Sequence, residues 1–237
     1  MYFLKYNKTI LEIYKDNWHH FNNNRYTNKN PNMQKLLLVF LILLTIGCKE
    51  TEFNTSWTKE QAPESFTARF ETTKGDFEME ITRSWSPQAA DRLYQLIKHG
   101  YYDNAIFYRV VPDFVAQFGN TDTKQMQEWK SIKIPDEPVL HSNTRGTISF
   151  ARFGKDSRDL EVFINLKDNK ILDTLNFEGV KGFTPIGKVK KGMETVDKLY
   201  SGYAEKPMND SNLYQNRDLF YQTFPKLDLI RKAYLVE

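Results

Sequence analysis

The most regular pattern in this chain is an alternation of apolar and polar residues that begins at Ser65. It runs through residues 65–72 (SFTARFET) and returns in residues 76–82 (DFEMEIT), with Thr73-Lys74-Gly75 before the second run. Strict alternation is typical of a strand with one buried face, and a short glycine-containing link between two such runs is typical of a hairpin. We therefore predict an antiparallel hairpin at the start of the folded region.

Residues 86–100 (SPQAADRLYQLIKHG) carry the signals of a helix. Ser86 is a favourable N-cap, Pro87 suits the first turn, and Gly100 favours termination. The apolar residues of this segment recur at helical spacing, which predicts one buried face. They are Ala90, Leu93, Leu96 and Ile97.

The rest of the folded region consists mostly of short apolar runs. A shorter helical pattern occupies residues 192–202, and residues 204–216, rich in Asn, Asp and Lys, are expected to form a surface loop. Many short strands with two helices favour a closed antiparallel barrel or a sandwich over alternating βαβ units. No break in composition marks a second domain. The further predicted strands are residues 105–111, 114–119, 146–152, 161–166, 183–189 and 230–237.

An uninterrupted apolar run occupies residues 36–46 (LLLVFLILLTI). A membrane-spanning helix needs about 20 such residues, so this run suits the hydrophobic region of a signal peptide, with Lys35 as its positive flank. Gly47 and Cys48 follow it, in a pattern that resembles a bacterial lipobox without the usual residues at Thr45 and Ile46. We expect cleavage before Cys48 and its lipidation; the alternative is a buried core strand that happens to end in a cysteine.

These signals divide the chain into four parts. Residues 1–32 are interpreted as an extension of the gene model upstream of a start at Met33, or as a disordered leader. Residues 33–47 are the signal peptide, and residues 48–64, polar and without periodicity, are a tether. Residues 65–237 form one domain. We expect a lipid-anchored, monomeric protein of the cell envelope that faces the periplasm or the cell exterior.

Charge argues against a nucleic-acid partner. The whole chain has a net charge of +3, but residues 1–47 hold six Lys/Arg and two Asp/Glu, a net +4. Subtracting this from +3 leaves −1 for the rest of the chain, which lacks the basic excess that phosphate binding requires.

Cys48 is the only cysteine. The predicted domain therefore has no disulfide framework and no thiolate metal site, and it must be stabilised by its hydrophobic core. Asp136, Glu137 and His141 lie close together in the sequence, but their spacing matches no metal motif, and we favour a solvated loop. His99 is expected to cap the end of the preceding helix.

Several segments in collinear order resemble the cyclophilin family of peptidyl-prolyl isomerases, over residues 66–237. The most diagnostic is residues 107–119 (FYRVVPDFVAQFG), after the opening hairpin and the helix. Residues 138–152, 162–166, 182–199 and 224–237 follow in family order. The resemblance implies a mainly β fold, an eight-stranded closed barrel capped by two helices.

The chemistry of such an enzyme is simple to state. Rotation about a peptide bond must overcome a barrier of about 18–20 kcal/mol, although the isomers of an X-Pro bond differ by only about 0.5–1 kcal/mol. The reaction needs no cofactor, metal or covalent intermediate. It needs an apolar pocket for the proline ring and a hydrogen-bond donor for the amide nitrogen, which becomes pyramidal and basic as the amide twists.

The resemblance assigns that donor to Arg109, the arginine of the F-x-R-V segment. A guanidinium suits the role because it is planar and always charged. Taken without the surrounding motif, Arg109 would be interpreted as an ordinary arginine on a solvent-facing strand.

The resemblance assigns the proline pocket to Phe114, Val115, Phe163 and Leu172, with Ala151 beside them. The alternative for all of them is barrel core. Gln117 matches a glutamine that bonds the substrate backbone and supports the arginine. A buried glutamine also needs hydrogen-bond partners, which suits that role.

Four positions depart from the family pattern. Glu161 replaces a common glutamine, and we expect its carboxylate to bind Arg109 or Arg152, either orienting the catalytic arginine or holding it away from substrate. Arg152 stands where asparagine, whose backbone contacts the peptide, is common. Ile171 replaces a tryptophan, and Phe183 aligns with a histidine that lines the pocket in many members.

Two functions of the domain remain open from the sequence, beside a third interpretation, a mainly structural lipoprotein of the cell envelope, which rests only on the anchor. The first is an active isomerase that acts on proline-containing segments of exported proteins. The second is a non-catalytic module that binds such segments as a chaperone or scaffold. Arg109 favours catalysis, while Glu161 admits a weakly active site.

Overall fold

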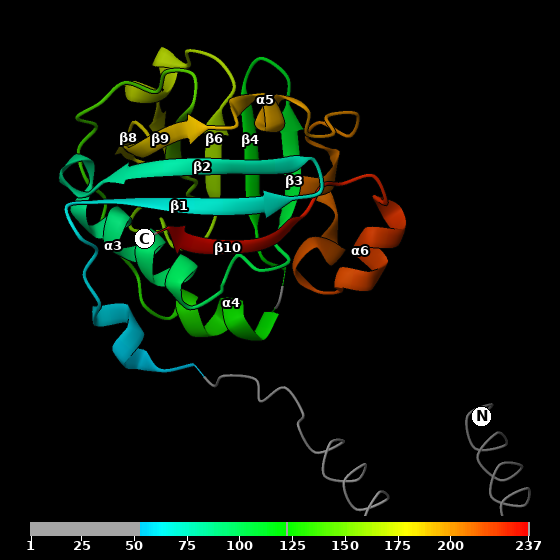
Figure 1. Ribbon diagram of the computed structural model, residues 1–237, viewed down its shortest axis with the longest axis horizontal. Helices are drawn as coiled ribbons and strands as arrows, with labels where there is room; N and C mark the ends of the chain where they lie inside the picture. Colours follow the sequence, from blue (N-terminus) through cyan, green and yellow to red (C-terminus); the bar gives the residue numbers. More distant parts are fainter. Residues whose placement is uncertain (1–52, 122, 237) are drawn as a thin grey trace, which may run out of the picture. The chain divides into compact units, whose positions relative to one another are not determined.

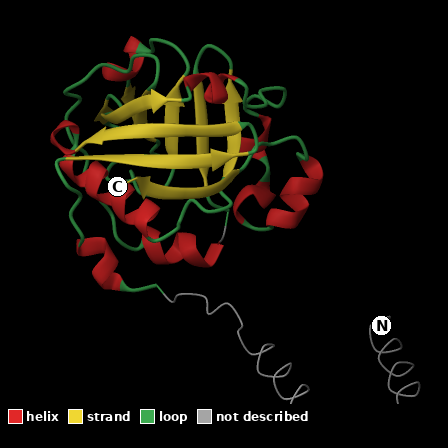
Figure 2. Ribbon diagram, in the orientation of Figure 1, coloured by secondary structure: helices red, strands yellow, loops and turns green. Residues whose placement is uncertain are grey.

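The computed structural model describes residues 53–121 and 123–236. The expectations for residues 1–47 and for Cys48 fall outside this part of the chain. Within it the architecture is mainly β (Figure 1, Figure 2). The strands are β1 (Ser65–Thr72), β2 (Gly75–Thr82), β3 (Ile106–Val111), β4 (Val115–Gly119), β5 (Thr147–Phe150), β6 (Val162–Asn165), β7 (Asn176–Phe177), β8 (Val180–Lys181), β9 (Pro185–Lys191) and β10 (Ile230–Val236).

Helices are short and lie outside the sheet. The α-helices are α3 (Pro87–Lys98), α4 (Thr123–Lys130), α5 (Met193–Asp197) and α6 (Arg217–Thr223). The 3-10 turns are η1 (Thr55–Lys59), η2 (Arg83–Trp85), η3 (Lys170–Asp173), η4 (Lys206–Asn209) and η5 (Ser211–Tyr214).

Eight strands form one antiparallel sheet in the order β10-β1-β2-β9-β5-β6-β4-β3. The sheet curls strongly, so that β1, β2 and β10 cross β3, β4 and β6 at a steep angle (Figure 1). The expected closed barrel is wrong. The outer strands β3 and β10 meet only at an isolated bridge between Ile106 and Leu229. The sheet is therefore a half-barrel that no ladder of hydrogen bonds closes.

The packing against β3 explains why the sheet stays open. Beyond the bridge, the chain before β10 leaves the sheet edge and builds a second apolar cluster on Ile106 and Tyr108 of β3. Leu213, Phe220, Phe224 and Leu227 complete this cluster. Further along β3, Val110 forms a second isolated bridge with Ala204, so a segment other than β10 occupies the edge where a closing strand would continue.

The predicted hairpin is confirmed. β1 pairs with β2 through the turn at residues 73–74, and the two strands bury the apolar residues of the alternating pattern. Phe70 and Phe77 lie opposite each other with their rings stacked at 4.9 Å. Cross-strand aromatic pairs of this kind stabilise a sheet beyond simple burial.

The predicted helix is confirmed as α3, and its four apolar residues are buried. Its cap, however, comes from another segment. Ser86 makes no side-chain bond to the helix and instead donates to the Glu137 carboxylate. Glu137 accepts from the backbone N–H groups of Gln88 (3.0 Å) and Ala89 (3.3 Å). It also pairs with the buried guanidinium of Arg158 at 3.1 Å. Glu137 is therefore a helix cap and not part of a solvated loop.

The expected number of helices was too small. The pattern at residues 192–202 corresponds to α5, but α4 and α6 were not expected, and residues 204–216 contain η4 and η5 instead of a plain loop. α4 buries only Met126 and Trp129, and two apolar positions are too few to reveal a helix by periodicity.

Residues 53–64, expected to be part of a free tether, pack against the domain. The Trp57 ring stacks on His99 at 4.1 Å, and Phe53 contacts the Trp129 ring. His99 ends α3, as expected, and its side chain also contacts the Glu60 carboxylate at 3.1 Å. Residues 53–121 and 123–236 contain no helix with the length and apolar character that a bilayer crossing requires.

The role of Glu137 leads to a stability prediction. Glu137→Ala should lower the free energy of unfolding by about 3 kcal/mol, because Arg158 loses the nearer of its two carboxylates and α3 loses its acceptor. Urea denaturation measures the change. The matched control is Glu194→Ala in the exposed first turn of α5, which should change stability by less than about 0.5 kcal/mol. Equal effects of the two variants would contradict the capping role.

Candidate functional site

A groove of about 360 Å³ opens on the convex side of β4 and β6. Its volume lies within the usual range for small-ligand sites. Eight of the nine predicted groove residues line it: Arg109, Phe114, Val115, Gln117, Ala151, Arg152, Phe163 and Leu172. Glu161 does not. Phe183, at the position of the family's histidine, also lines the groove, as do six residues that the sequence did not indicate: Phe153, Leu175, Phe177, Glu205, Met208 and Asn209.

The floor of the groove is apolar because β4 and β6 are buried on both faces. On one face, Ala116, Phe118, Val162 and Ile164 belong to the main core. On the other, Val115 and Phe163 form a separate buried cluster with Leu172. Partly buried Phe114, Ala151 and Phe183 pack against this cluster. The groove thus has a rigid floor whose reverse side is the protein core.

The β3–β4 hairpin positions the guanidinium of Arg109. Arg109 lies opposite Gln117, and the pairing register shifts by one residue between Ile106 and Arg109. Such a bulge redirects side chains locally, which is why bulges are frequent beside active sites. The shift places Arg109 in the groove.

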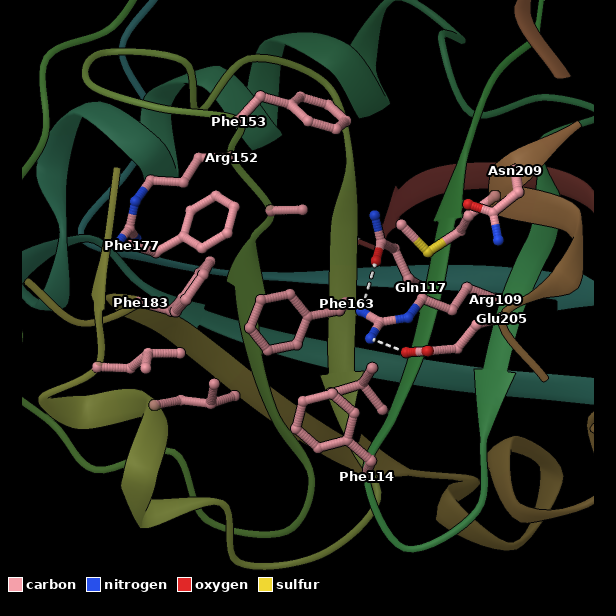
Figure 3. A pocket seen from close by; sticks show the side chains of 15 residues that line it. Arg109, Phe114, Gln117, Arg152, Phe153, Phe163, Phe177, Phe183, Glu205 and Asn209 are labelled. Carbon is pink, nitrogen blue, oxygen red and sulfur yellow. Dashed lines mark hydrogen bonds and ion pairs between the residues drawn. The ribbon is translucent and has the colours of Figure 1, made fainter. Parts of the chain in front are cut away.

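Three contacts fix Arg109 in the groove. Its Nη1 donates to Gln117 Oε1 at 3.3 Å, and its Nη2 donates to Glu205 Oε1 at 2.5 Å. The guanidinium carbon lies 5.3 Å from the centre of the Phe114 ring. Figure 3 shows Arg109 between Gln117 and Glu205, to one side of Phe163. The Arg109 guanidinium is therefore held at one edge of an apolar floor.

Arg152 occupies the opposite side of Phe163, beside Phe177 and Phe183 (Figure 3). Its guanidinium lies 4.0 Å from the centre of the Phe183 ring and donates to the carbonyl oxygens of Gly182 and of Val180 (2.8 Å). Burial lowers the pKa of this arginine. These contacts tie the β8 segment to the groove wall.

Glu161 lies behind the groove, and the expected contact with Arg109 or Arg152 is wrong. Its carboxylate accepts hydrogen bonds from the hydroxyl groups of Tyr108 and of Tyr214 (3.0 Å). A Cβ atom at Gly119 would come within 3.0 Å of the carboxylate, so glycine provides the space. Burial raises the pKa of Glu161 to about 8, and the hydrogen bond from Tyr214 partly opposes this rise.

Two features explain why the six further groove residues were missed. Glu205, Met208 and Asn209 belong to the segment expected to be a plain surface loop. Phe153, Leu175 and Phe177 lie in segments without a regular strand or helix pattern. Exposed apolar residues are common on protein surfaces, so their type alone did not indicate a site.

The site thus offers no arrangement for nucleophilic or metal chemistry in the described part of the chain, where no cluster of His, Cys, Asp and Glu has the geometry of a metal site. It offers an apolar floor, a fixed guanidinium and an amide. This set suits the binding and electrostatic stabilisation of a peptide segment.

Comparison with known proteins agrees with this description. The family described as cyclophilin type peptidyl-prolyl cis-trans isomerase/CLD matches residues 67–216. A peptidyl-prolyl cis-trans isomerase of Acinetobacter baylyi is 33% identical over 147 residues, which cover 61% of this chain and 75% of the relative. Peptidyl-prolyl cis-trans isomerase B of Escherichia coli is 29% identical over 175 residues, which cover 70% and 97%.

Solved structures show the same fold. A cyclophilin-type isomerase of Cryptosporidium parvum matches with a TM-score of 0.51 at 19% identity, over 73% of this chain and 98% of the other. The same protein in the presence of the dipeptide Ala-Pro matches with a TM-score of 0.51 over 72% of this chain and 99% of the other. The chain belongs to the cyclophilin-type peptidyl-prolyl cis-trans isomerase family. Its enzyme class is accordingly that of a peptidyl-prolyl isomerase.

The raised pKa of Glu161 leads to a prediction about stability. Between the ordinary value of 4.5 and about 8, the folded protein keeps a proton that the unfolded chain has lost. Stability therefore falls as the pH rises through this range: the contribution is complete below 4.5 and lost above about 8. Urea denaturation of the native protein and of Glu161→Gln at several pH values measures the effect. The native protein should lose stability relative to the variant as the pH rises, and parallel curves would refute the assignment.

Proposed function

We propose that this protein catalyses cis–trans isomerisation of X-Pro bonds in exported proteins, with Arg109 as the donor to the prolyl nitrogen. The observation that carries the proposal is the position of Arg109, held by Gln117 and Glu205 beside the apolar cluster of Val115, Phe163 and Leu172. One side chain that always carries a charge thus faces a surface suited to a proline ring.

The mechanism follows from what changes along the reaction. Burial of the proline ring on the floor holds one side of the amide, while the acyl side is free to rotate. In the planar amide the nitrogen lone pair is delocalised and accepts poorly. In the twisted amide the lone pair is localised, so the Arg109 donor stabilises the transition state more than the ground state. Because Arg109 is already fixed, little reorganisation is needed during the reaction.

Gln117 and Glu205 have distinct roles in this mechanism. Gln117 is 3% exposed and binds Arg109 from within the sheet. Glu205 reaches Arg109 from the loop before η4, and its side chain is 58% exposed. Exposed ion pairs contribute only about 0–1 kcal/mol, so Glu205 orients the guanidinium without trapping it.

Catalysis of X-Pro isomerisation in exported proteins is useful because the uncatalysed reaction is slow. X-Pro bonds exchange in tens to hundreds of seconds and limit the folding of many chains. The signal-like run at residues 36–46 and Cys48 support an envelope location, with an acylated Cys48 as the membrane anchor. The proposed clients are proline-containing segments of proteins that fold outside the cytoplasm.

A second candidate is a module that binds such segments without turning them over. The exposed apolar rim of the groove favours it: Phe153 is 64% exposed, and Phe177, Leu175 and Met208 are also exposed. Contiguous exposed apolar groups commonly mark sites of protein interaction. Catalysis and binding are separable, because Phe177 lies across Phe163 from Arg109 (Figure 3).

Arg109→Ala should lower kcat/KM by about a hundredfold, because it removes one fixed transition-state donor, while peptide affinity is largely retained. NMR exchange spectroscopy on a short Ala-Pro-Phe peptide measures both quantities. The matched control is Arg145→Ala, which removes an arginine paired with Asp197 outside the groove and should leave the rate unchanged.

The outcomes separate the candidates. If the native protein binds the peptide without accelerating exchange, the binding module is correct. If Arg109→Ala and the native protein accelerate exchange equally, Arg109 is not the donor.

The proposed anchor is tested in a bacterial host that expresses the full chain. Labelled palmitate should be incorporated into the native protein, which should fractionate with membranes. Cys48→Ser should lose both the label and the membrane association, because it removes the only thiol. Thr51→Ser, a similar change nearby, should behave as the native chain does. Equal labelling of Cys48→Ser would refute lipidation at this residue.

A further inference from the structure

A chain of hydrogen bonds runs from the buried Glu161 to Arg109 in the groove. Glu161 Oε2 accepts from the Tyr108 hydroxyl group, whose oxygen accepts from Gln117 Nε2. Gln117 Oε1 then accepts from Arg109 Nη1 at 3.3 Å. Glu161, Tyr108 and Gln117 are each at most 3% exposed. This series of hydrogen bonds thus runs from the residue before β6, through β3 and β4, to the groove.

The chemistry of the two end groups, Glu161 and Arg109, fixes which group donates and which accepts in each of these hydrogen bonds. An ionised carboxylate only accepts hydrogen bonds, and a guanidinium only donates them. Tyr108 must therefore donate to Glu161, which leaves its oxygen to accept from the amide NH2 of Gln117. The amide oxygen of Gln117 then faces Arg109. A reversed Gln117 would place an NH2 donor against the guanidinium and lose both bonds.

We propose that Glu161, in its ionised form, is a positioning residue that fixes the orientation of Gln117 through Tyr108 and thereby holds Arg109 in place. This inference rests on the proposed role of Arg109. The proposal also gives a reason for a glutamate at residue 161, where cyclophilins commonly have glutamine. A glutamine at residue 161 can offer Tyr108 either a donor or an acceptor, so it does not fix the direction of the chain.

Protonation of Glu161 also removes the constraint on the orientation of Tyr108 and Gln117. A neutral carboxyl group carries one donor, and when this donor faces Tyr108, the hydroxyl group turns toward Gln117 and the amide reverses. Because burial raises the pKa of Glu161 to about 8, the change falls near neutral pH. Activity should therefore rise as the pH rises through this value. The stability of the fold should fall over the same range, as derived above.

The titratable side chains that bond or face Glu161 are tyrosines. Tyr108 comes from β3, Tyr214 from η5 and Tyr102 from the turn after α3, and burial raises the pKa of Tyr102 and Tyr214 well above neutral. Gly119 of β4 contributes no side chain. Asp159 acts electrostatically on Tyr102 and Tyr214; burial raises the pKa of Asp159, and Lys130 and Arg92 oppose this rise.

The first test is the pH profile of kcat/KM on the Ala-Pro-Phe peptide. In the native protein we expect a rise of up to about a hundredfold, the cost of displacing a catalytic group by about 1 Å, with an inflection near the pKa of Glu161. Glu161→Gln and Tyr108→Phe should give lower, flat profiles, with the loss mainly in kcat. Glu80→Gln, which removes a carboxylate on β2 that pairs with Lys190 of β9, should keep the native profile. A flat native profile, or the same inflection in Glu161→Gln, would overturn the proposal.

A second measurement does not depend on activity. The side-chain amide signals of Gln117 and the Nε–H signal of Arg109, followed by NMR against pH, should shift together in the native protein and stay constant in Glu161→Gln. Signals that stay constant with pH in the native protein would overturn the proposed coupling between Glu161 and Arg109, even if the enzyme is active. If Arg109→Ala is fully active while the Gln117 signals titrate as expected, the proposed role of Arg109 as the donor fails and the coupling from Glu161 through Tyr108 stands.

Discussion

The central constraint on this structure is that β4 and β6 are buried on both faces. On one face Phe118 and Ile164 complete the core, and on the other Val115 and Phe163 form the floor of the groove. Protein interiors are packed at nearly crystalline density, so a floor that shares its strands with the core cannot shift independently. The placement of Arg109 depends on the same strands. The rigidity that this catalysis requires is thus a consequence of the burial that stabilises the fold.

Local sequence patterns predicted the individual strands and helices of this fold better than they predicted whether the sheet closes into a barrel. Alternation gave β1 and β2, and the spacing of apolar residues gave α3, because these signals reflect burial of one face. The closed barrel was wrong because closure depends on β3 and β10, which are far apart in the sequence and meet only at Ile106 and Leu229. The cap of α3 shows the same limit. Ser86 marked the start of the helix, but a distant carboxylate on Glu137 satisfies its N–H groups.

The groove was predictable to the extent that a linear motif carries it. Residues 107–119 supply both sides of one hairpin, so their side chains are close in space for local reasons. Glu205 reaches Arg109 from a loop that is mostly polar and without periodicity, and no local sequence signal indicates that contact. Glu161 illustrates a different failure. Strand alternation would place it on the same face as Phe163, but it precedes β6, where alternation no longer applies, and its carboxylate bonds Tyr108 instead.

The buried carboxylate of Glu161 makes sense only if stability and activity are considered together. Burial of an ionised group is costly, and the raised pKa of Glu161 is the measure of that cost. A glutamine would remove the penalty, because an amide can bond both tyrosines without a charge. If the ionised form orients Gln117 and Arg109, as proposed, then the state that destabilises the fold is the state that orders the groove. Opposite pH slopes of stability and activity are the signature of this arrangement, since a purely structural carboxylate would give only the first.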